Sequence, residues 1–193
     1  MRKISSGRLI NLGCGGFPLK GFINVDINKD TAADIISDLN HFPYPFKDEA
    51  SNLIIIEHAL EHINEPLVAI KEIYRILMPG GKLIVKVPHF SRGFTHPGHR
   101  SGFDLSFSYN FSPHYQGGYV GVEFKLEKFR FRWFAQENLK KTVLPPVAYV
   151  IAKFAGILVD MLANASPFFC SRVWAFWVGG FDEIEFHFIK PEC

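Results

Sequence analysis

Short apolar runs separated by small and polar residues make up the first half of the chain. Four of these runs are Leu9–Leu12, Ile23–Val25, Ala33–Leu39 and Leu53–Ile56. Their length and their content of Ile, Leu and Val predict buried strands. Residues 16–22, which lead into the second run, are fewer than the ~10 to 12 that a helical crossover needs. The first helix is therefore predicted to be shortened or absent.

A helical period follows the fourth run. Asn64 is a candidate N-cap, Pro66 stands in the first turn, and Gly80–Gly81 marks the predicted end of the helix. Lys82–Pro88 then predicts a fifth strand that ends at His89. The residues of the apolar helix face are Leu67, Ile70, Ile73, Tyr74 and Leu77.

The second half of the chain is less regular. Residues 90–118 are rich in Ser, Gly, Pro, His and aromatic residues and have no clean period, which is typical of a functional loop. Residues 122–134 alternate, but their phase slips at Glu127–Lys128, which predicts a strand with a bulge. Residues 147–163 predict a long apolar helix, and residues 183–190 alternate as a last strand.

These patterns favour an α/β fold, namely a Rossmann-like, doubly wound, mostly parallel sheet. Ligands of such sheets lie outside the carboxyl ends of the strands, and right-handed crossovers bring those ends to one edge. With 193 residues, 48% of them hydrophobic, the chain is expected to form one core and a single domain over residues 1–193.

Composition excludes several classes of protein. The formal net charge is only +2, so no nucleic-acid partner is expected. The three cysteines, at positions 14, 170 and 193, have no paired spacing, which suits a reducing cytoplasm. The first eight residues are too short and too polar for an apolar targeting region. We therefore expect a cytoplasmic protein.

The turn after the first run has the chemistry of a nucleotide site. Glycines at positions 13, 15 and 16 allow the backbone to approach a ligand closely, and Asp26, at the end of the second run, can accept two ribose hydroxyls. A dinucleotide motif would have a third glycine and an acid roughly 20 residues on. Here Phe17–Pro18 replaces that glycine and Asp26 follows Gly13 by thirteen residues.

Polar residues recur at the predicted carboxyl end of every parallel strand. A structural protein has no need for a polar group at each of these ends, so their convergence on one sheet edge indicates a binding site. The residues at these ends are Gly13, Asp26, Asp38, Glu57 with His58, and His89.

Five motifs follow one another in order: Asn11–Gly15, Asn24–Asp26, Ile36–Leu39, Glu57–His62 and Arg75–Val85. In this order they resemble class I S-adenosylmethionine-dependent methyltransferases, of the type 11 group. The resemblance implies methyl transfer from S-adenosyl-L-methionine and a last strand that runs antiparallel. It also implies a cofactor-binding half over residues 1–90, followed by an acceptor-recognition loop and helical insertion over residues 91–181.

The resemblance also implies roles for individual residues. His58 and His89 are the candidates for a catalytic base, because strand ends are rigid. Asn11 stands where the family more often has an acid. The residues expected to bind the cofactor are Asn11, Gly13, Cys14, Gly15, Asp26, Ile27, Asp38, Leu39 and Glu57. For Asp38, capping of a turn is the alternative.

His58-x-x-Glu61-His62 also matches the H-x-x-E-H motif of inverted zinc peptidases, which would make the chain a metal-dependent hydrolase. That chemistry needs both histidines one turn apart on a helix, whereas here the motif directly follows a buried strand. No metal is expected, although some ubiquinone-pathway O-methyltransferases, which this stretch resembles, hold a divalent ion in the corresponding segment. A cofactor-binding module without turnover is a further alternative.

The acceptor is expected to be a small molecule, a glycan or a lipid-linked compound. In residues 90–118, cationic groups and aromatic rings could form its site, or the rings could simply form the core of a small cap. The residues concerned are Arg92, His96, His99 and Arg100, with Phe90, Phe94, Phe103, Phe107 and Tyr109. The helix at 147–163 is expected to pack on the core or against a second copy, with a membrane surface as the alternative.

Overall fold

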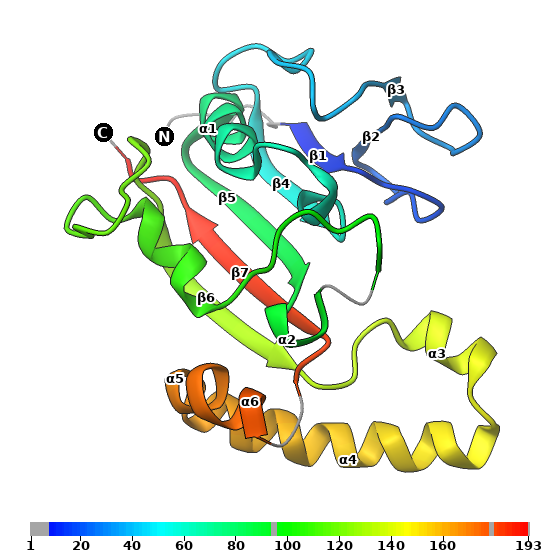
Figure 1. The fold of residues 1–193 in the computed structure, drawn as a ribbon. Helices are drawn as coiled ribbons and strands as arrows, with labels where there is room; N and C mark the ends of the chain where they lie inside the picture. The colour runs from blue at the N-terminus through cyan, green and yellow to red at the C-terminus, as the bar shows by residue number, and fades with distance from the viewer. Residues whose placement is uncertain (1–7, 94–95, 178–179, 193) are drawn as a thin grey trace, which may run out of the picture.

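The computed structural model describes residues 8–93, 96–177 and 180–192, with a seven-stranded sheet at their centre (Figure 1). The strand order is β3-β2-β1-β4-β5-β7-β6, in which β7 runs antiparallel to its neighbours β5 and β6 and the other pairs are parallel. The predicted fold class, with its antiparallel last strand, is confirmed. The strands are β1 (Arg8–Leu12), β2 (Ile23–Asp26), β3 (Ile35–Ile36), β4 (Ser51–Glu57), β5 (Leu77–Pro88), β6 (Lys125–Arg132) and β7 (Glu183–Ile189).

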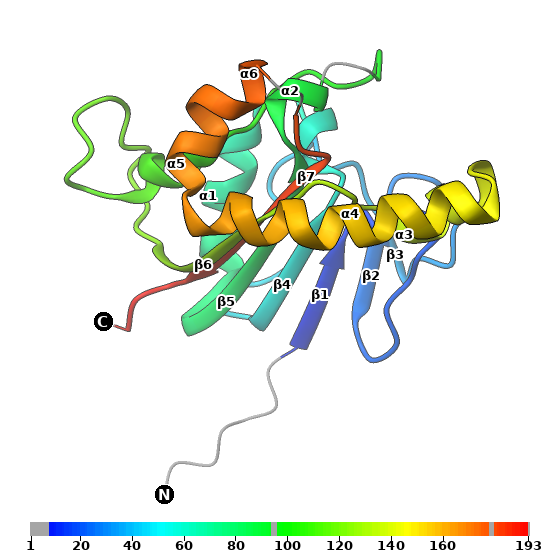
Figure 2. The ribbon, with the colours of Figure 1, turned by 90° about the horizontal axis from the view of Figure 1, so that it is seen from below.

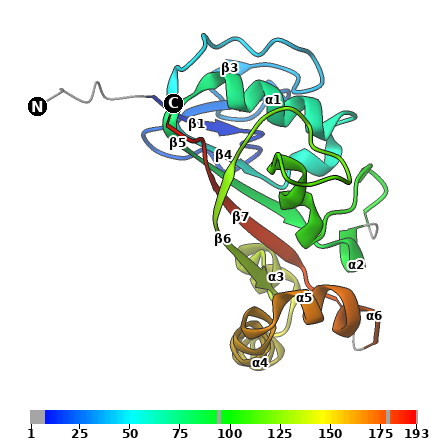
Figure 3. The same ribbon diagram turned by 90° about the vertical axis from the view of Figure 1, so that its left-hand side faces the viewer.

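Helices cover the two sides of the sheet unevenly. The helix α1 and the 3-10 helix η2 pack on one face, whereas α3 and α4 lie on the opposite side, beyond the carboxyl ends of the parallel strands (Figures 1 and 3). The helical elements are η1 (Leu60–His62), α1 (Pro66–Ile76), α2 (Phe90–Gly93), η2 (Leu105–Phe111), α3 (Glu137–Val143), α4 (Pro146–Ala165), α5 (Pro167–Phe169), the π-helical turn η3 (Cys170–Trp174) and α6 (Ala175–Trp177).

The core lies between the sheet and the layer formed by α1 and η2. Alternate residues of the central strands point into it, so that Val85 of β5 and Phe186 of β7 are fully buried. The ring of Phe107, in η2, packs 5.6 Å from that of Phe186, and the ring of Phe111 packs 5.2 Å from that of Phe188. The aromatic residues of the irregular segment therefore take the place of a regular helix on this face.

The first three strands are joined by loops. Residues 13–22, all of which the structure describes, contain no helix, as predicted. The third strand is shorter than predicted, because only Ile35 and Ile36 pair with β2 and the chain turns away before Asp38.

Both ends of α1 differ from prediction. Glu65 rather than Asn64 holds the N-cap position, although Pro66 does begin the helix. The helix ends at Ile76, and Gly80–Gly81 lies within β5. The helix ends early because the backbone of Leu77 is extended and pairs with Ser51 of β4.

The bulge in β6 occurs where the phase slips. The pairing of β6 with β7 shifts between Leu126 and Lys128, so Glu127 is the inserted residue. After the shift, Phe131 lies opposite Ile184 and is fully buried. The extra residue keeps the apolar positions on the core side, as the sequence predicted.

The apolar helix, predicted to pack on the core or against a second copy, contacts the core through only a few residues, such as Ala163 and Val159. Only Gly156 and Ala163 of α4 are buried, and Figure 2 shows the helix crossing the sheet at its edge. Its contacts with the sheet are made with β6 and the residues just after it.

Candidate functional site

The turn after β1 is shaped by glycines. Gly13 has a φ of +70°, and a Cβ built on it would lie 2.4 Å from Cβ of Ala59, so no other residue fits. Gly15 has a φ of +52°, and a Cβ on Gly15 or Gly16 would meet no atom of the described chain within 4 Å. The turn is therefore closed on one side by Ala59, which follows β4, and open on the other, where a ligand can approach its backbone.

Asp26 lies directly behind this turn. Its Oδ2 accepts a hydrogen bond from the Gly15 N–H at 2.7 Å, and its Oδ1 accepts one from the Asn28 N–H at 2.9 Å. A carboxylate oxygen has two lone pairs, so each oxygen can accept a further hydroxyl. Ile27 is 62% exposed and places an apolar side chain next to the carboxylate. This pair suits the hydroxyls and the flat base of a nucleoside.

The Asn11 side chain is engaged elsewhere. It is buried, and its Nδ2 donates to Oδ1 of Asn24 at 3.0 Å. Asn24 Oδ1 also accepts from the Leu19 N–H, while its Nδ2 donates to Asp34. The network braces the loop between β1 and β2 through the Asn11 amide nitrogen, and the contact of Asn11 with a cofactor stays a prediction.

Cys14 contributes through its backbone. Its N–H shares the carbonyl of Val25 with the Gly13 N–H, at 3.0 and 2.8 Å. The side chain is buried, and burial followed by the charge of Asp26 raises the pKa of the thiol. Cys14 is thus a neutral part of the turn.

Asp38 caps a turn after β3. The Asn40 N–H donates to its Oδ1 at 2.9 Å, and Nδ1 of His41 lies 2.9 Å from its Oδ2. The hydrogen bond from Asn40 is the main cause that lowers the pKa of Asp38. This geometry favours the turn-capping alternative, and contact with an adenine stays a prediction. Leu39 is buried, with Cδ1 3.8 Å from the position of a Cβ on Gly13.

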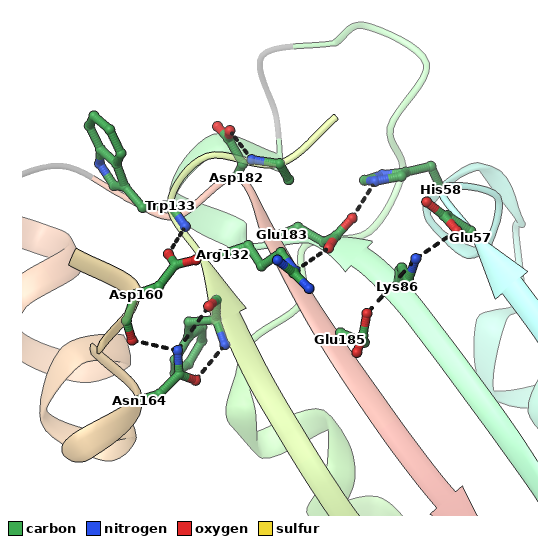
Figure 4. A network of polar contacts seen from close by, with 12 residues as sticks. Glu57, His58, Lys86, Arg132, Trp133, Asp160, Asn164, Asp182, Glu183 and Glu185 are labelled. Carbon is green, nitrogen blue, oxygen red and sulfur yellow. Dashed lines mark hydrogen bonds and ion pairs between the residues drawn. The ribbon is translucent and has the colours of Figure 1, made fainter. Parts of the chain in front are cut away.

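Charged residues of neighbouring strands lie next to one another at the carboxyl edge of the central strands (Figure 4). Glu57, the exposed last residue of β4, accepts from Lys86 Nζ at 2.9 Å. Lys86 also lies 3.8 Å from Glu185, which is its partner in β7. The carboxylate of Glu57 is therefore already neutralised by a lysine, and its predicted contact with a cofactor is untested.

His58 follows β4 with a backbone φ of +50°, which is unusual for a residue other than glycine. Its Nε2 lies 2.8 Å from Oε2 of Glu183, and its Nδ1 lies 3.5 Å from Oε1 of Glu61. Burial alone would lower the pKa of His58, but the carboxylates of Glu183 and Glu61 raise it to about 9. The two carboxylates therefore favour the protonated ring, which disfavours the predicted role of His58 as a general base.

Glu183 and Glu61 complete this cluster. Glu183 is buried at the start of β7, where Arg132 Nε lies 3.8 Å away. Glu61 is also buried, and neither of its carboxylate oxygens has a hydrogen-bond partner in the part of the chain that the structure describes. Sequence reasoning missed Glu183 because it considered only the ends of strands. The start of an antiparallel strand lies at the same edge, which is the signal that could have found it.

His89 is fully buried. Its ring nitrogens are hydrogen-bonded to the hydroxyls of Ser91 and Ser171, at 2.6 and 3.2 Å, and the rings of Phe131 and Phe181 pack against it. Burial lowers the pKa of His89 to about 4, so its ring is neutral. No acceptor can reach a side chain without exposed surface. The predicted catalytic role is therefore corrected to a structural one, which ties α2 to η3.

The segment 90–118 divides into core and surface. Phe103 and Phe107 are buried, so the prediction that they form the walls of an acceptor site is wrong for these two rings. His99 lies near the cluster, with Nε2 3.9 Å from Oε1 of Glu61, and the Arg100 N–H donates to the Glu61 carbonyl. Tyr109 is partly exposed, and Phe94 lies outside the described residues. Only part of the predicted acceptor surface is therefore available.

One segment of the chain is similar to a known protein family. Residues 20–85 match the model of a methyltransferase domain. This segment is therefore similar to a methyltransferase domain. Demethylmenaquinone methyltransferase of Chlamydia trachomatis serovar D is 41% identical over 49 residues, which are 25% of this chain and 20% of that protein. The match thus covers about a fifth of the length of the curated relative.

Solved structures match over nearly the whole chain. A SAM-dependent methyltransferase from Archaeoglobus fulgidus has a TM-score of 0.60 and 17% identity, covering 95% of this chain and 86% of that one. The cyclase SpnF has a TM-score of 0.54 and 16% identity, covering 98% and 78%. At these low sequence identities the similarity shows only the fold. SpnF illustrates this, because it is named as a cyclase and not as a methyltransferase.

The glycine turn and Asp26 fit S-adenosylmethionine, the cofactor that the matched family implies. Asp26 and Ile27 would hold the ribose and the base, and the open backbone of Gly15 and Gly16 would face the rest of the molecule. When bound, S-adenosylmethionine supplies an electrophilic methyl group. The observation that supports the fit is the space above the two glycines beside a carboxylate with free lone pairs.

The H-x-x-E-H segment of the domain does not have the geometry of a peptidase. His58 lies before η1, in a left-handed backbone position, and His62 ends η1, so the two do not share a helix. His62, His96 and His99 form one group whose ligand atoms lie within 4.8 Å of one another, and Glu57, His58 and Glu183 form a second. In the second group, His58 is held as a cation by carboxylates, which opposes binding of a metal.

Proposed function

We propose that this domain transfers a methyl group from S-adenosylmethionine to a small-molecule acceptor. The observation that carries the proposal is the open glycine turn with Asp26 hydrogen-bonded behind it. Asp26 lies inside the segment that matches a methyltransferase domain, and the turn directly precedes that segment. The name of the Chlamydia relatives gives demethylmenaquinone as their acceptor, which supports a small molecule here.

The cluster around His58 supports an acceptor with an acidic hydroxyl, such as a phenol or enol. An imidazolium held between Glu183 and Glu61 can donate to an oxyanion and lower the pKa of the hydroxyl from which it forms. The acceptor would then arrive as the nucleophile without needing a separate base. Methyl transfer is an in-line displacement, so holding the oxyanion in position would supply much of the rate.

Calorimetry with S-adenosylhomocysteine tests the cofactor site. We expect binding by the wild-type protein, weakened at least tenfold in Asp26→Ala, because hydrogen bonds to a charged group contribute about 1.5–3 kcal/mol each. Asp30→Ala is the matched control, since Asp30 is an exposed acid on the same loop. Binding by a folded Asp26→Ala within threefold of wild type would contradict the proposed site.

Turnover is tested separately. The protein is incubated with S-adenosylmethionine and a panel of phenols, quinols and enols, and release of S-adenosylhomocysteine is measured. His58→Gln should bind S-adenosylhomocysteine within about twofold of wild type but lose turnover with the acceptor found, because glutamine keeps the polarity and lacks the charge. Binding without turnover on any acceptor would support the module alternative.

A further inference from the structure

Three histidines from two separate segments meet beyond the carboxyl end of β4. His62 ends η1, whereas His96 and His99 belong to a turn that follows α2. Each ring offers one nitrogen atom, and these three nitrogens lie within 4.8 Å of one another. The ring centroid of His99 lies 4.9 Å from those of His62 and His96. Three imidazoles at this spacing form a ligand set that divalent transition metals such as zinc prefer.

Backbone hydrogen bonds hold the two segments together. The His99 N–H donates to the carbonyl of His96 at 3.1 Å, which closes a β-turn with these two residues at its ends. The next residue fixes the turn to η1, since the Arg100 N–H donates to the Glu61 carbonyl at 2.8 Å. Because His62 directly follows Glu61, the backbone itself brings the three rings to one place.

Gly98 lies between two of the rings. A Cβ on this residue would lie 3.1 Å from Nδ1 of His96 and 3.4 Å from Nδ1 of His62, so glycine allows both rings to approach the turn. The Gly98 carbonyl is 3.0 Å from Nδ1 of His62. A carbonyl can only accept, so this nitrogen carries the proton and the lone pair of the neutral ring is on Nε2. Metal-binding histidines hold their second nitrogen in the same way.

The His96 ring would have to adjust on binding. Its Nδ1 accepts from the Gly98 N–H at 3.1 Å, and water can replace this exposed hydrogen bond if the ring turns. In a tetrahedral zinc site with Zn–N bonds of about 2.0–2.1 Å the nitrogens lie about 3.4 Å apart, so the rings have to close by at most about 1.4 Å. His62 and His96 are exposed, and exposed side chains change rotamer readily.

A buried carboxylate lies behind His99. Glu61 is 1% exposed, and neither of its carboxylate oxygens has a hydrogen-bond partner in the part of the chain that the structure describes. Its Oε1 lies 3.9 Å from Nε2 of His99 and 3.5 Å from Nδ1 of His58, whose ring is closer to Glu183, at 2.8 Å. A buried charge that lacks hydrogen bonds is costly. A cation on the three histidines would offset this charge, and Glu61 would orient the His99 ring.

We propose that His62, His96 and His99 form a zinc site that fastens the 96–99 turn to η1, with Glu61 as the carboxylate that orients His99. Neutral imidazole suits zinc, whereas magnesium and calcium prefer oxygen ligands. Three protein ligands leave a fourth position for water or for an oxygen atom of a bound molecule. The inference departs from the expectation, drawn from the sequence, that no metal is bound. It does not depend on the proposed function, since zinc binding is measured without cofactor or acceptor.

Isothermal titration of the untagged full chain with zinc chloride, after removal of metal by a chelator, tests the proposal. We expect one zinc per chain with a Kd of about 1 µM or below. His62→Gln and His99→Gln should each weaken binding by more than about tenfold, because each removes a ligand. Glu61→Gln keeps the three ligands and removes the charge, so it should weaken binding about tenfold. His114→Gln, at an exposed histidine outside the cluster, is the matched control and should stay within about twofold.

Thermal unfolding shows whether zinc fastens the turn. Zinc should raise the Tm of the wild type and should raise that of His99→Gln by clearly less. Midpoints close to that of the wild type without zinc show that the variants are folded, and two independent ligand variants guard against the loss of one.

Three results would overturn the proposal. One is an absence of binding up to about 100 µM zinc, and another is binding that none of the cluster variants weakens. The third is binding that is lost in Glu57→Gln but kept in His99→Gln, because it would place the ion in the group of Glu57, His58 and Glu183. Zinc binding without affinity for S-adenosylhomocysteine would leave this proposal standing and refute the proposed function.

Discussion

His58 is the residue whose environment most changes its chemistry. Its ring is held between Glu183 and Glu61, and its folded pKa is about 9, above the ordinary value of 6.5. Because the pKa is raised on folding, the protonated ring stabilises the protein most fully below the unfolded value. This contribution is lost as the pH rises through about 9.

We therefore predict that His58→Gln removes a pH-dependent part of the stability. The difference in free energy of unfolding between wild type and variant should be largest below pH 6.5 and should shrink as the pH approaches 10. Urea unfolding of both proteins at several pH values measures this. Other groups also make the stability depend on pH, for example Lys140, whose pKa is lowered to about 8 by burial and then by Arg92. Their contribution is the same in both proteins and therefore cancels in the difference. A difference that is constant from pH 6 to 10 would contradict the assignment.

At the scale of elements, α4 completes the edge of the sheet. β6 is an outer strand, and the Asn164 side chain pairs with both backbone groups of Phe131, accepting at 2.8 Å and donating at 3.0 Å. Unpaired backbone N–H and C=O groups on an edge strand can pair with other chains. The Asn164 amide binds such groups, so it protects the strand and also positions the helix.

Asn164→Leu should accordingly lower the free energy of unfolding by about 1–3 kcal/mol, because it leaves a backbone donor and an acceptor without partners. Chemical denaturation measures the loss. Leu162→Ala, two residues away on the outward face, should change stability by less than about 0.5 kcal/mol. Equal effects of the two substitutions would show that α4 is not anchored through Asn164.

At the scale of the whole molecule, the loops that form the candidate cofactor site lie in a part of the fold that has little secondary structure. β3 has two residues, and the segment between β1 and β2 has no helix to support it. A ligand that bridges the glycine turn and Asp26 would connect β1 with β2 and so stabilise this end of the sheet.

We predict that S-adenosylhomocysteine at a hundred times its Kd stabilises the protein by about 2.7 kcal/mol. For a chain of this size that corresponds to a rise in Tm of about 5–10 °C. Differential scanning fluorimetry measures the shift. Asp26→Ala at the same ligand concentration should show a clearly smaller one, and a wild-type Tm that does not respond would place the nucleoside site elsewhere.

The sequence by itself determined where the strands lie along the chain, the glycine turn with Asp26, and the bulge at Glu127. These follow from local rules, because periodicity sets which residues share a face and glycine sets where the backbone can turn. Even the apolar face of α4 was visible in the sequence.

Tertiary structure decided which contacts each of these faces and side chains makes. His58 and His89 stand at comparable strand ends, yet a carboxylate 125 residues away makes the first a cation, and burial among serines and phenylalanines keeps the second neutral. No local pattern encodes such partners. The outward orientation of α4 likewise depends on β6, since its backbone groups bind the polar side chains of the helix and leave the larger apolar ones facing away.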